Sequence, residues 1–432
     1  MLAVGRSPYD REIVALALPA LGALAAEPLY LLADTAIVGH LGTTQLAALA
    51  LAATGLGAVT TVFNFLVYGT TAQVARAHGG GEAARAHELG SQAVWLGLAL
   101  GCVLAVATLA LATPAVTLLG RHGEVASLAA RYLRISAAGL PAVLLATAGQ
   151  GYLRGISALR RPLEIVIAAN VANLALEAVL VYGLRLGLDG SALGTVLAQL
   201  GMGVAFLTVV WPLPRPRPRQ MRGLARIGAE IAIRTSVLYA SFVVASAVLA
   251  RIGKASLGAH QIAFQLYNLL ALVLDALAIA GQVMVGRMLG AGDGEGALAA
   301  ARRLTVLSLI GGCATGLALA ALYGPLPHVF TSDARVIDRL HAIWPLFAAM
   351  QPAAAAAFAL DGVLIGAGDT RFLAFAMTLA ALAFYIPLAL LALALHWGIV
   401  GVWAGLLALI GVRLATNVAR FMRRRWIVLG AG

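Results

Sequence analysis

The sequence predicts an all-α polytopic membrane protein whose twelve transmembrane helices form two pseudo-symmetric six-helix lobes. Of its 432 residues, 61% are hydrophobic and only 11% are charged, whereas soluble domains carry about 25% charged residues. Apolar segments of about 20 residues, long enough to cross a bilayer as helices, recur from end to end. The second half also repeats the first at a constant offset, which places Gly253 on Gly42 and Gly401 on Gly190. Because each copy holds six spans, both copies have the same orientation in the membrane.

Apolar blocks between polar and glycine-rich breaks define the predicted spans. Their approximate extents are 13–38, 46–75, 90–113, 127–152, 162–183, 189–211, 228–250, 257–286, 301–323, 339–365, 371–395 and 399–421. Proline and arginine alternate between Trp211 and Gly223, which disfavours a helix and favours an extended, solvated linker. We therefore expect an N-lobe at 1–211, a linker at 212–226 and a C-lobe at 227–432.

The net charge of +12 does not indicate nucleic-acid binding, because the arginines form short clusters between apolar segments. Arg6 and Arg11 precede the first span and Arg76 follows the second, whereas the opposite loops, such as the one with Arg121, carry fewer. The positive-inside rule then places both termini in the cytoplasm. We therefore expect a multi-pass protein of a bacterial inner membrane, with membrane lipid in contact with its helices.

The two copies differ most at polar positions inside the spans of the first copy. Asp34 lies in an otherwise apolar span, where a charge costs about 2.5–3.5 kcal/mol even on lenient scales. Tyr30 lies one turn before it, and Asn173 and Glu177 have similar helical spacing in the fifth span. Together with the Thr195 hydroxyl, these groups could cage Na⁺, or the two acids could exchange a proton. Two plainer roles stay open: Asp34 could reach the membrane interface, and Glu177 could accept a structural hydrogen bond.

Two parallel lobes predict a central cleft and alternating access, as in transporters. Polar positions of both copies are candidates to line this cleft, and an acid among them would attract a cation, although packing roles are equally open. These candidates are Asn64, Gln150, Gln261, Gln265, Asp275, Gln282 and Asp361. Pro19 and Pro28 lie inside the first span, where each removes a backbone hydrogen bond and permits a bend.

Several motifs resemble those of the MATE family of multidrug and toxic compound extrusion transporters, and most closely its DinF-type branch. The matching stretches are PLYLLADTAIVGHLG, GAHQIAFQL, ALAIAGQVMVGRMLGAGD and LDGVLIGAGDTR. The resemblance implies export of cationic amphipathic compounds, driven by inward H⁺ or Na⁺. Asp34 looks like the family's essential first-span aspartate, and Pro19 like the proline where that helix bends.

The resemblance also places Asn173, Glu177 and Thr195 among the polar members of the family's N-lobe site. Glu177 departs from the pattern, which more often has aspartate, and its extra methylene favours H⁺ at least as much as Na⁺. We therefore expect a monomeric secondary antiporter with no cofactor and no metal apart from the coupling ion.

The sequence gives less support to two other classes of membrane protein. A lipid-linked precursor flippase would need a basic cleft, whereas most intramembrane charges here are acidic. An intramembrane enzyme would need a motif such as HExxH or GxSxG with partners, and the sequence has neither.

Overall fold

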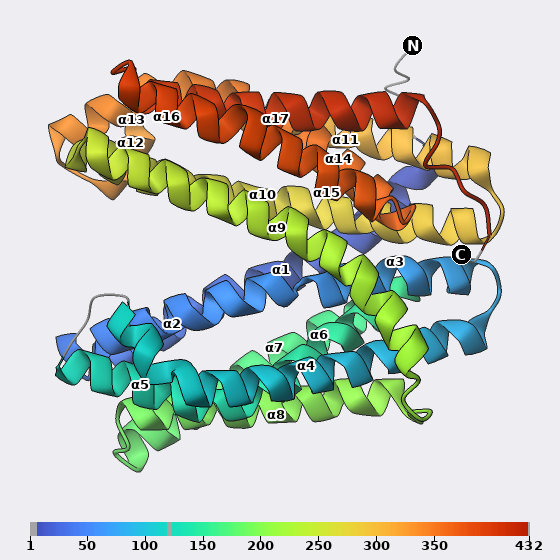
Figure 1. Cartoon of the computed structure of the whole chain (residues 1–432), viewed down its shortest axis with the longest axis horizontal. Helices are drawn as coiled ribbons and strands as arrows, with labels where there is room; N and C mark the ends of the chain where they lie inside the picture. Colours follow the sequence, from blue (N-terminus) through green and yellow to red (C-terminus); the bar gives the residue numbers. More distant parts are fainter. Residues whose placement is uncertain (1–6, 119–122, 431–432) are drawn as a thin grey trace. The chain divides into compact units, whose positions relative to one another are not determined.

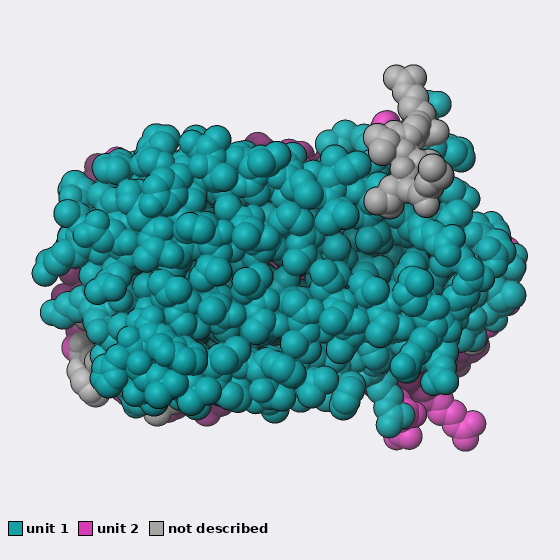
Figure 2. Space-filling model, turned by 90° about the horizontal axis from the view of Figure 1, so that it is seen from above, with its two compact units in different colours: residues 1–18, 230–432 teal, residues 19–229 magenta. Residues whose placement is uncertain are grey.

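The computed structural model describes residues 7–118 and 123–430, and the elements in this part of the chain are helices (Figure 1). These helices fall into two compact units, coloured separately in Figure 2. One unit comprises residues 19–229, and the other comprises residues 1–18 together with residues 230–432. Arg6 and Arg121, which the topology argument used, lie outside the described residues.

The unit of residues 19–229 is built around helix α6 (Leu140–Gly155), which packs against three other helices of the unit. Those three are α3 (Phe65–Gly79), α4 (Ala83–Leu118) and α8 (Leu188–Val210). The remaining elements are most of α1 (Pro8–Gly39), α2 (Thr43–Phe63), α5 (Glu124–Ser136), η1 (Ala137–Gly139), α7 (Arg160–Glu177) and η2 (Ala178–Gly183).

The other unit has the same plan, with α14 (Gln351–Gly366) at its centre. This helix packs against α10 (Lys254–Gly290), α11 (Gly294–Ala321) and α17 (Gly398–Met422). The remaining elements are most of α9 (Pro218–Ile252), α12 (Pro325–Phe330), α13 (Ala334–Ala349), α15 (Thr370–Leu379), η3 (Ala380–Tyr385) and α16 (Ile386–Ala394).

Repeat-related glycines make the same close contact in both units. A Cβ atom on Gly101 would lie 2.4 Å from the Cα of Pro141, and one on Gly312 would lie 2.9 Å from the Cα of Pro352. Only glycine lets two helix backbones approach so closely. Each contact falls near an interruption of the α-helix, at the 3₁₀ turn η1 in one unit and at the bend between α13 and α14 in the other. The duplication that the sequence predicts is therefore present in the contacts between helices.

All twelve predicted spans have a counterpart. Ten helices of the described chain are long and apolar enough to cross a membrane, and the bent pair α13–α14, with an angle of 49°, adds an eleventh. The remaining predicted span, 46–75, corresponds to α2 and α3, which are interrupted at Asn64. Predicted ends differ by several residues; the third span, for example, extends through α4 from Ala83 to Leu118.

The predicted linker is shorter and more ordered than expected. Helix α9 begins at Pro218, because proline is tolerated in the first turn, where the backbone N–H would have no helical partner. The stretch before it is held on α4: Trp95 Nε1 donates to the Pro214 carbonyl at 3.0 Å, and Gln92 Nε2 donates to the Arg215 carbonyl at 3.1 Å. This segment is therefore anchored rather than freely solvated.

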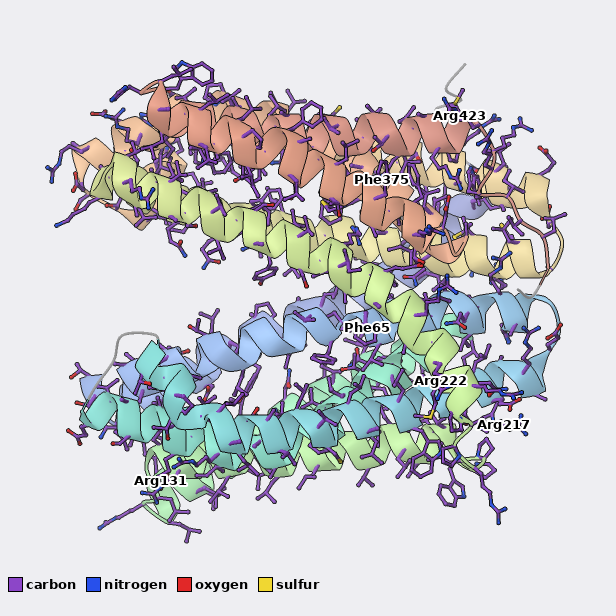
Figure 3. The ribbon with its side chains drawn as sticks, in the orientation of Figure 1. Phe65, Arg131, Arg217, Arg222, Phe375 and Arg423 are labelled. Atoms are coloured by element: carbon purple, nitrogen blue, oxygen red, sulfur yellow. The ribbon has the colours of Figure 1, made fainter. Side chains whose placement is uncertain are left out.

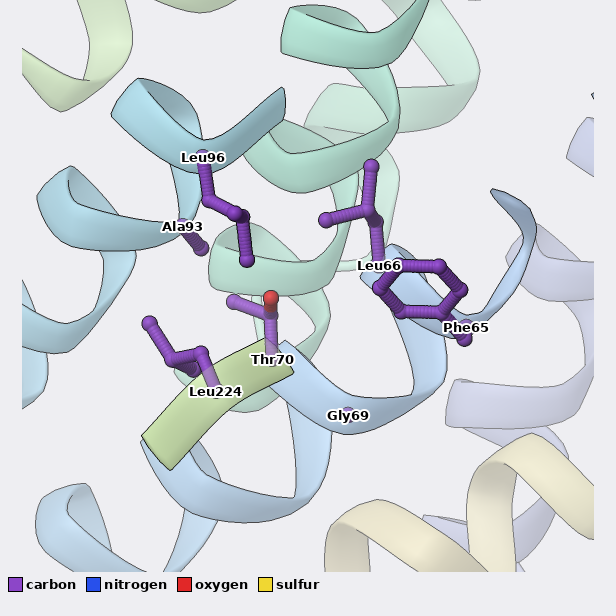
Figure 4. A pocket seen from close by; sticks show the side chains of 7 residues that line it. All are labelled: Phe65, Leu66, Gly69, Thr70, Ala93, Leu96 and Leu224. Carbon is purple, nitrogen blue, oxygen red and sulfur yellow. The ribbon is translucent and has the colours of Figure 1, made fainter. Parts of the chain in front are cut away.

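The first turns of α9 belong to the unit of residues 19–229. Leu224 is buried against α3 and α4, where it lines a narrow apolar crevice with Phe65, Thr70 and Leu96 (Figure 4). The crevice has no room for a water molecule, so we interpret it as a packing contact. Arg217 and Arg222, from the same turns of chain, lie at the end of this unit opposite to Arg131 (Figure 3).

Candidate functional site

Three helices of the unit of residues 19–229 bring the predicted polar residues together. Asp34 on α1 is 3% exposed, and Asn173 and Glu177 on α7 are 4% and 0% exposed. Thr195 on α8 and Tyr30 on α1 are half-buried beside them. The close approach of α7 and α8 depends on Gly194, since a Cβ there would lie 3.0 Å from the Cγ of Glu177. The polar residues of α1, Tyr30 and Asp34, and those of α7, Asn173 and Glu177, therefore face one another.

Glu177 is the centre of a small hydroxyl network. Its Oε1 accepts hydrogen bonds from the Tyr30 hydroxyl and from the Thr195 hydroxyl, each at 3.2 Å. The Tyr30 and Thr195 hydroxyls are themselves 3.0 Å apart. One carboxyl oxygen is thus held by two neutral donors, which fix its position without neutralising its charge.

Asp34 joins this network through two residues that the sequence analysis did not identify. Its Oδ1 accepts a hydrogen bond from the Ser191 hydroxyl at 2.9 Å. The Tyr132 hydroxyl on α5 interacts with Ser191 and Thr195 and faces both acids. Ser191 precedes Thr195 by one turn of α8, so helical spacing from Thr195 could have indicated it; a single tyrosine on α5 carries no comparable signal.

The two carboxyl groups also interact directly with each other. Two ionised carboxylates repel, so a direct contact between them is favourable when they share a proton or a cation. Among the residues that the structure describes, none of the ion pairs involves Asp34 or Glu177. The negative charge of this acid pair can therefore be compensated by a bound proton or another bound cation.

Two further oxygens of the site, Asn173 Oδ1 and Glu177 Oε2, are buried without a hydrogen-bond partner in the described structure. Such oxygens could accept from a protonated acid or could coordinate Na⁺. Neighbouring Asn170 has a different contact, since its Nδ2 donates to the Ala26 carbonyl of α1 at 3.1 Å. Asn170 thus holds α1 against α7 in the turn that contains Pro28.

Pro19 and Pro28 both lie within α1, which continues as a helix through both positions. Pro19 is also the first residue of its compact unit, because residues 1–18 group with residues 230–432. The boundary between the units therefore falls at a turn that lacks one backbone hydrogen bond.

In the other unit the contacts of Asp361 favour the packing role over attraction of a cationic substrate, the two roles that the sequence left open. Asp361 is 2% exposed and forms ion pairs with Arg234 and Arg413, while Asn417 Nδ2 donates to its Oδ1 at 2.6 Å. Asp275, the other acid expected in the cleft, interacts with Arg413. Asp361 is thus paired with two arginines, because an isolated charge at this depth would be costly, and Asp275 lies in the field of one of them.

Neither arginine was assigned a partner from the sequence. Arg234 on α9 pairs with Asp361. Arg413 on α17 was missed, although it is 3% exposed and lies 4.6 Å from the centre of the Phe358 ring. The spacing of Arg413 and Asn417, one helical turn apart, was a usable signal.

The other predicted cleft residues do not form one group. Asn64 is exposed at the break between α2 and α3, and Gln261 and Gln265 are exposed on α10. Gln150 is half-buried on α6 and accepts from Arg154 Nη2 at 3.5 Å, whereas Gln282 is buried.

A duplicated bundle of membrane-spanning helices, with a buried acid pair in one copy only, defines the class of multi-pass membrane transporters. The chain belongs to the MatE family, whose model matches residues 19–179 and again residues 231–391. Each match falls within one compact unit, so the comparison confirms the internal repeat. The predicted resemblance is likewise confirmed, and the family is one of transporters rather than enzymes.

Relatives cover nearly the whole chain. Protein DETOXIFICATION 44, chloroplastic, of Arabidopsis thaliana is 31% identical over 97% of this chain and 84% of its own length. DNA damage-inducible protein F of Escherichia coli is 27% identical over 96% of this chain and 93% of its own. The bent form of the Vibrio cholerae MATE transporter VcmN has a TM-score of 0.87 at 21% identity and covers 96% of both chains. This last likeness concerns the fold alone.

Proposed function

We propose that the protein is a secondary antiporter that exports cationic amphipathic compounds in exchange for a proton bound at Asp34 and Glu177. The observation that carries the proposal is the pair of buried carboxyl groups surrounded by neutral hydroxyl donors. A buried acid pair without an arginine or lysine partner requires a proton or another cation to offset its charge. Binding and release of that cation can therefore be coupled to a change in the protein.

A proton is preferred over Na⁺ as the coupling ion. The direct interaction between the two carboxyl groups suits a shared proton, and the hydroxyls of Tyr30 and Ser191 already fill one oxygen of each acid. Na⁺ would need several oxygens at short distances around one point. Asn173 Oδ1 and Glu177 Oε2 are buried oxygens without a hydrogen-bond partner in the described part of the chain, so Na⁺ is the alternative that the experiment must test.

In the proposed cycle the acids are ionised while the substrate is bound, and protonation from outside favours release. Loss of their charge changes the hydrogen bonds between α1, α7 and α8, and α1 can bend at Pro19 or Pro28 because each proline leaves a carbonyl without its helical donor. A structural relative described as being in the bent form is consistent with such a motion. We place the protein in a bacterial inner membrane with both termini in the cytoplasm, as the arginine distribution suggests.

The test is export of ethidium, an organic cation, from proteoliposomes under separately imposed pH and Na⁺ gradients. We expect the pH gradient to drive export and Asp34→Asn to abolish it, because an amide cannot bind and release a proton. Glu27→Gln is the matched control, since it removes an exposed carboxylate from the same helix. Full gradient-driven export by Asp34→Asn would contradict the proposed mechanism, and export driven by Na⁺ alone would replace the proton with sodium.

A further inference from the structure

A cavity of about 240 Å³ lies at the end of the unit of residues 19–229 where α1 ends and α8 begins. It is lined by Leu41 and Gln45, by Leu128 on α5, and by Leu188 and Asp189 in the first turn of α8. Since a water molecule in the liquid occupies about 30 Å³, the cavity has room for several. Gln45 and Asp189 provide the polar groups that would hold them.

On two separate helices, α5 and α8, a residue that lines the cavity lies one helical turn from a residue of the buried acid site. Leu188 precedes Ser191 by three residues on α8, a rise of about 4.5 Å, and Leu128 precedes Tyr132 by four residues on α5, a rise of about 6 Å. Leu41 follows the end of α1 at Gly39, seven residues after Asp34. The cavity is thus stacked on the acid site along the helix axes.

Two buried hydroxyl groups lie one helical turn from residues that line the cavity, Ser191 after Leu188 and Tyr132 after Leu128. Ser191 is 0% exposed and donates to Asp34, and Tyr132 is 4% exposed and interacts with Ser191. Each hydroxyl can accept one proton and donate another. This short chain of hydroxyls can pass a proton, whereas Na⁺ would have to displace the side chains.

One ion pair lies across this end of the unit. Arg131 on α5 pairs with Asp189 on α8, and the Arg131 side chain is 66% exposed whereas that of Asp189 is 20% exposed. Arg131 projects at the end of the unit in Figure 3. Asp189 is therefore the acid of the cavity, and Arg131 is its solvent-exposed counter-charge.

We propose that this cavity is the port through which protons reach Asp34 and Glu177, with the Arg131–Asp189 ion pair as its gate. The inference rests on the proposed function, since it names the route to the same acid pair. Asp189 attracts the proton, Arg131 competes with it, and the hydroxyls of Tyr132 and Ser191 carry it to Asp34.

The decisive experiment compares Arg131→Gln with Asp189→Asn, because both variants break the same ion pair. In right-side-out vesicles loaded with ethidium, initial export is measured against external pH. At high external pH, where proton supply limits the rate, Arg131→Gln should be about threefold faster than the wild type and Asp189→Asn about threefold slower. At low external pH both should approach the wild-type rate.

A purely structural ion pair would make both variants change in the same direction at every pH, and that result would overturn the inference. Unchanged rates in both variants would overturn it as well. Failure of the proposed function has a different signature, because the wild type itself would then show no export driven by the pH gradient.

Thiol labelling provides a second measurement that does not depend on the ion pair. The exposed cysteines Cys102 and Cys313 are first replaced by serine, and Leu128→Cys is then treated with a membrane-impermeant cationic methanethiosulfonate. We expect the export rate of this variant to fall at least fivefold on labelling. Arg339→Cys is the control, because Arg339 is the exposed, repeat-related position of Leu128 in the other unit. Equal effects of labelling on the two variants would refute the port.

Discussion

At the scale of single residues, the protein holds buried acids in two different ways. Asp34 and Glu177 are held by hydroxyl groups, which leave their charge uncompensated. Asp361 is held by Arg234 and Arg413, which compensate its charge permanently. The first arrangement suits a group that gains and loses a cation, and the second suits a structural contact.

Asp361→Asn should therefore destabilise the protein strongly. The change removes the buried carboxylate that pairs with Arg234 and Arg413, and breaking a buried pair in this way costs about 3–5 kcal/mol. Thermal unfolding in detergent measures the loss. Gln150→Ala is the control, because Gln150 is the half-buried repeat counterpart of Asp361 and should change the midpoint little. A wild-type midpoint for Asp361→Asn would show that the arginines have other partners.

At the scale of single residues, the sequence indicated which residues the structure brings together where a residue type is costly in a membrane. Acids inside apolar spans are conspicuous, and helical spacing linked Asp34 to Tyr30 and Glu177 to Asn173. Ser191 and Tyr132 were missed because serine and tyrosine occur widely in membrane helices without a functional role. The pairing of Asp361 with arginines from α9 and α17 was not predictable, since it depends on how three distant helices pack.

At the scale of helices, glycine contacts fix the distances between neighbours. Gly312 on α11 meets the backbone of α14, and a Cβ there would lie 2.8 Å from the Gln351 carbonyl oxygen. Gly311, the preceding residue, has no atom within 4 Å of such a Cβ. A side chain can therefore be accommodated at Gly311 but not at Gly312, although the two residues are adjacent on one helix.

Gly312→Ala should lower the free energy of unfolding by about 1–3 kcal/mol, because the added methyl group forces α11 and α14 apart. Gly311→Ala should leave it unchanged or raise it by up to about 1 kcal/mol, since alanine favours a helix more than glycine does. Denaturation of both variants under the same conditions tests the pair. Equal destabilisation would show that helix propensity, rather than the contact with α14, decides the outcome.

Helix number and order were predictable, whereas helix ends and breaks were only partly so. Hydropathy indicates which residues cross the apolar layer, but it does not indicate how far a helix extends beyond them, as α4 does before its predicted start. The proline-rich linker was predicted as extended up to residue 226. The pattern of prolines could not reveal that α9 would begin at Pro218 and pack Leu224 against α3 and α4.

At the scale of the whole molecule, the first turns of α1 are held by ion pairs in the unit of residues 230–432. Arg303 Nε donates to Asp10 Oδ1 at 2.6 Å, and Arg287 Nη2 donates to Glu12 Oε1 at 2.5 Å. Ile13 and Leu16 are buried on the same stretch. The ion pairs and the apolar contacts together explain why residues 1–18 group with the second repeat.

The double variant Asp10→Asn/Glu12→Gln should loosen this stretch selectively. Removal of both carboxylates breaks both ion pairs, so amide hydrogen exchange should become at least tenfold faster in residues 8–18 and stay unchanged in residues 20–39. Arg11→Gln serves as the control, because Arg11 is exposed between the two acids. Faster exchange along the whole of α1 would show that the helix opens as one unit and that Pro19 is no boundary.

The division of the chain at residues 18 and 229 has a consequence for how the protein can be taken apart. The leading arm of each repeat belongs to the other repeat's unit: residues 1–18 of the first lie with the second, and the α9 residues up to 229 lie with the first. Each repeat thus contributes its first residues to the unit formed mainly by the other repeat. Cleavage of the chain between residues 212 and 217 would therefore give two fragments, neither of which contains a complete unit. The first fragment would retain residues 1–18, and the second would retain residues 218–229.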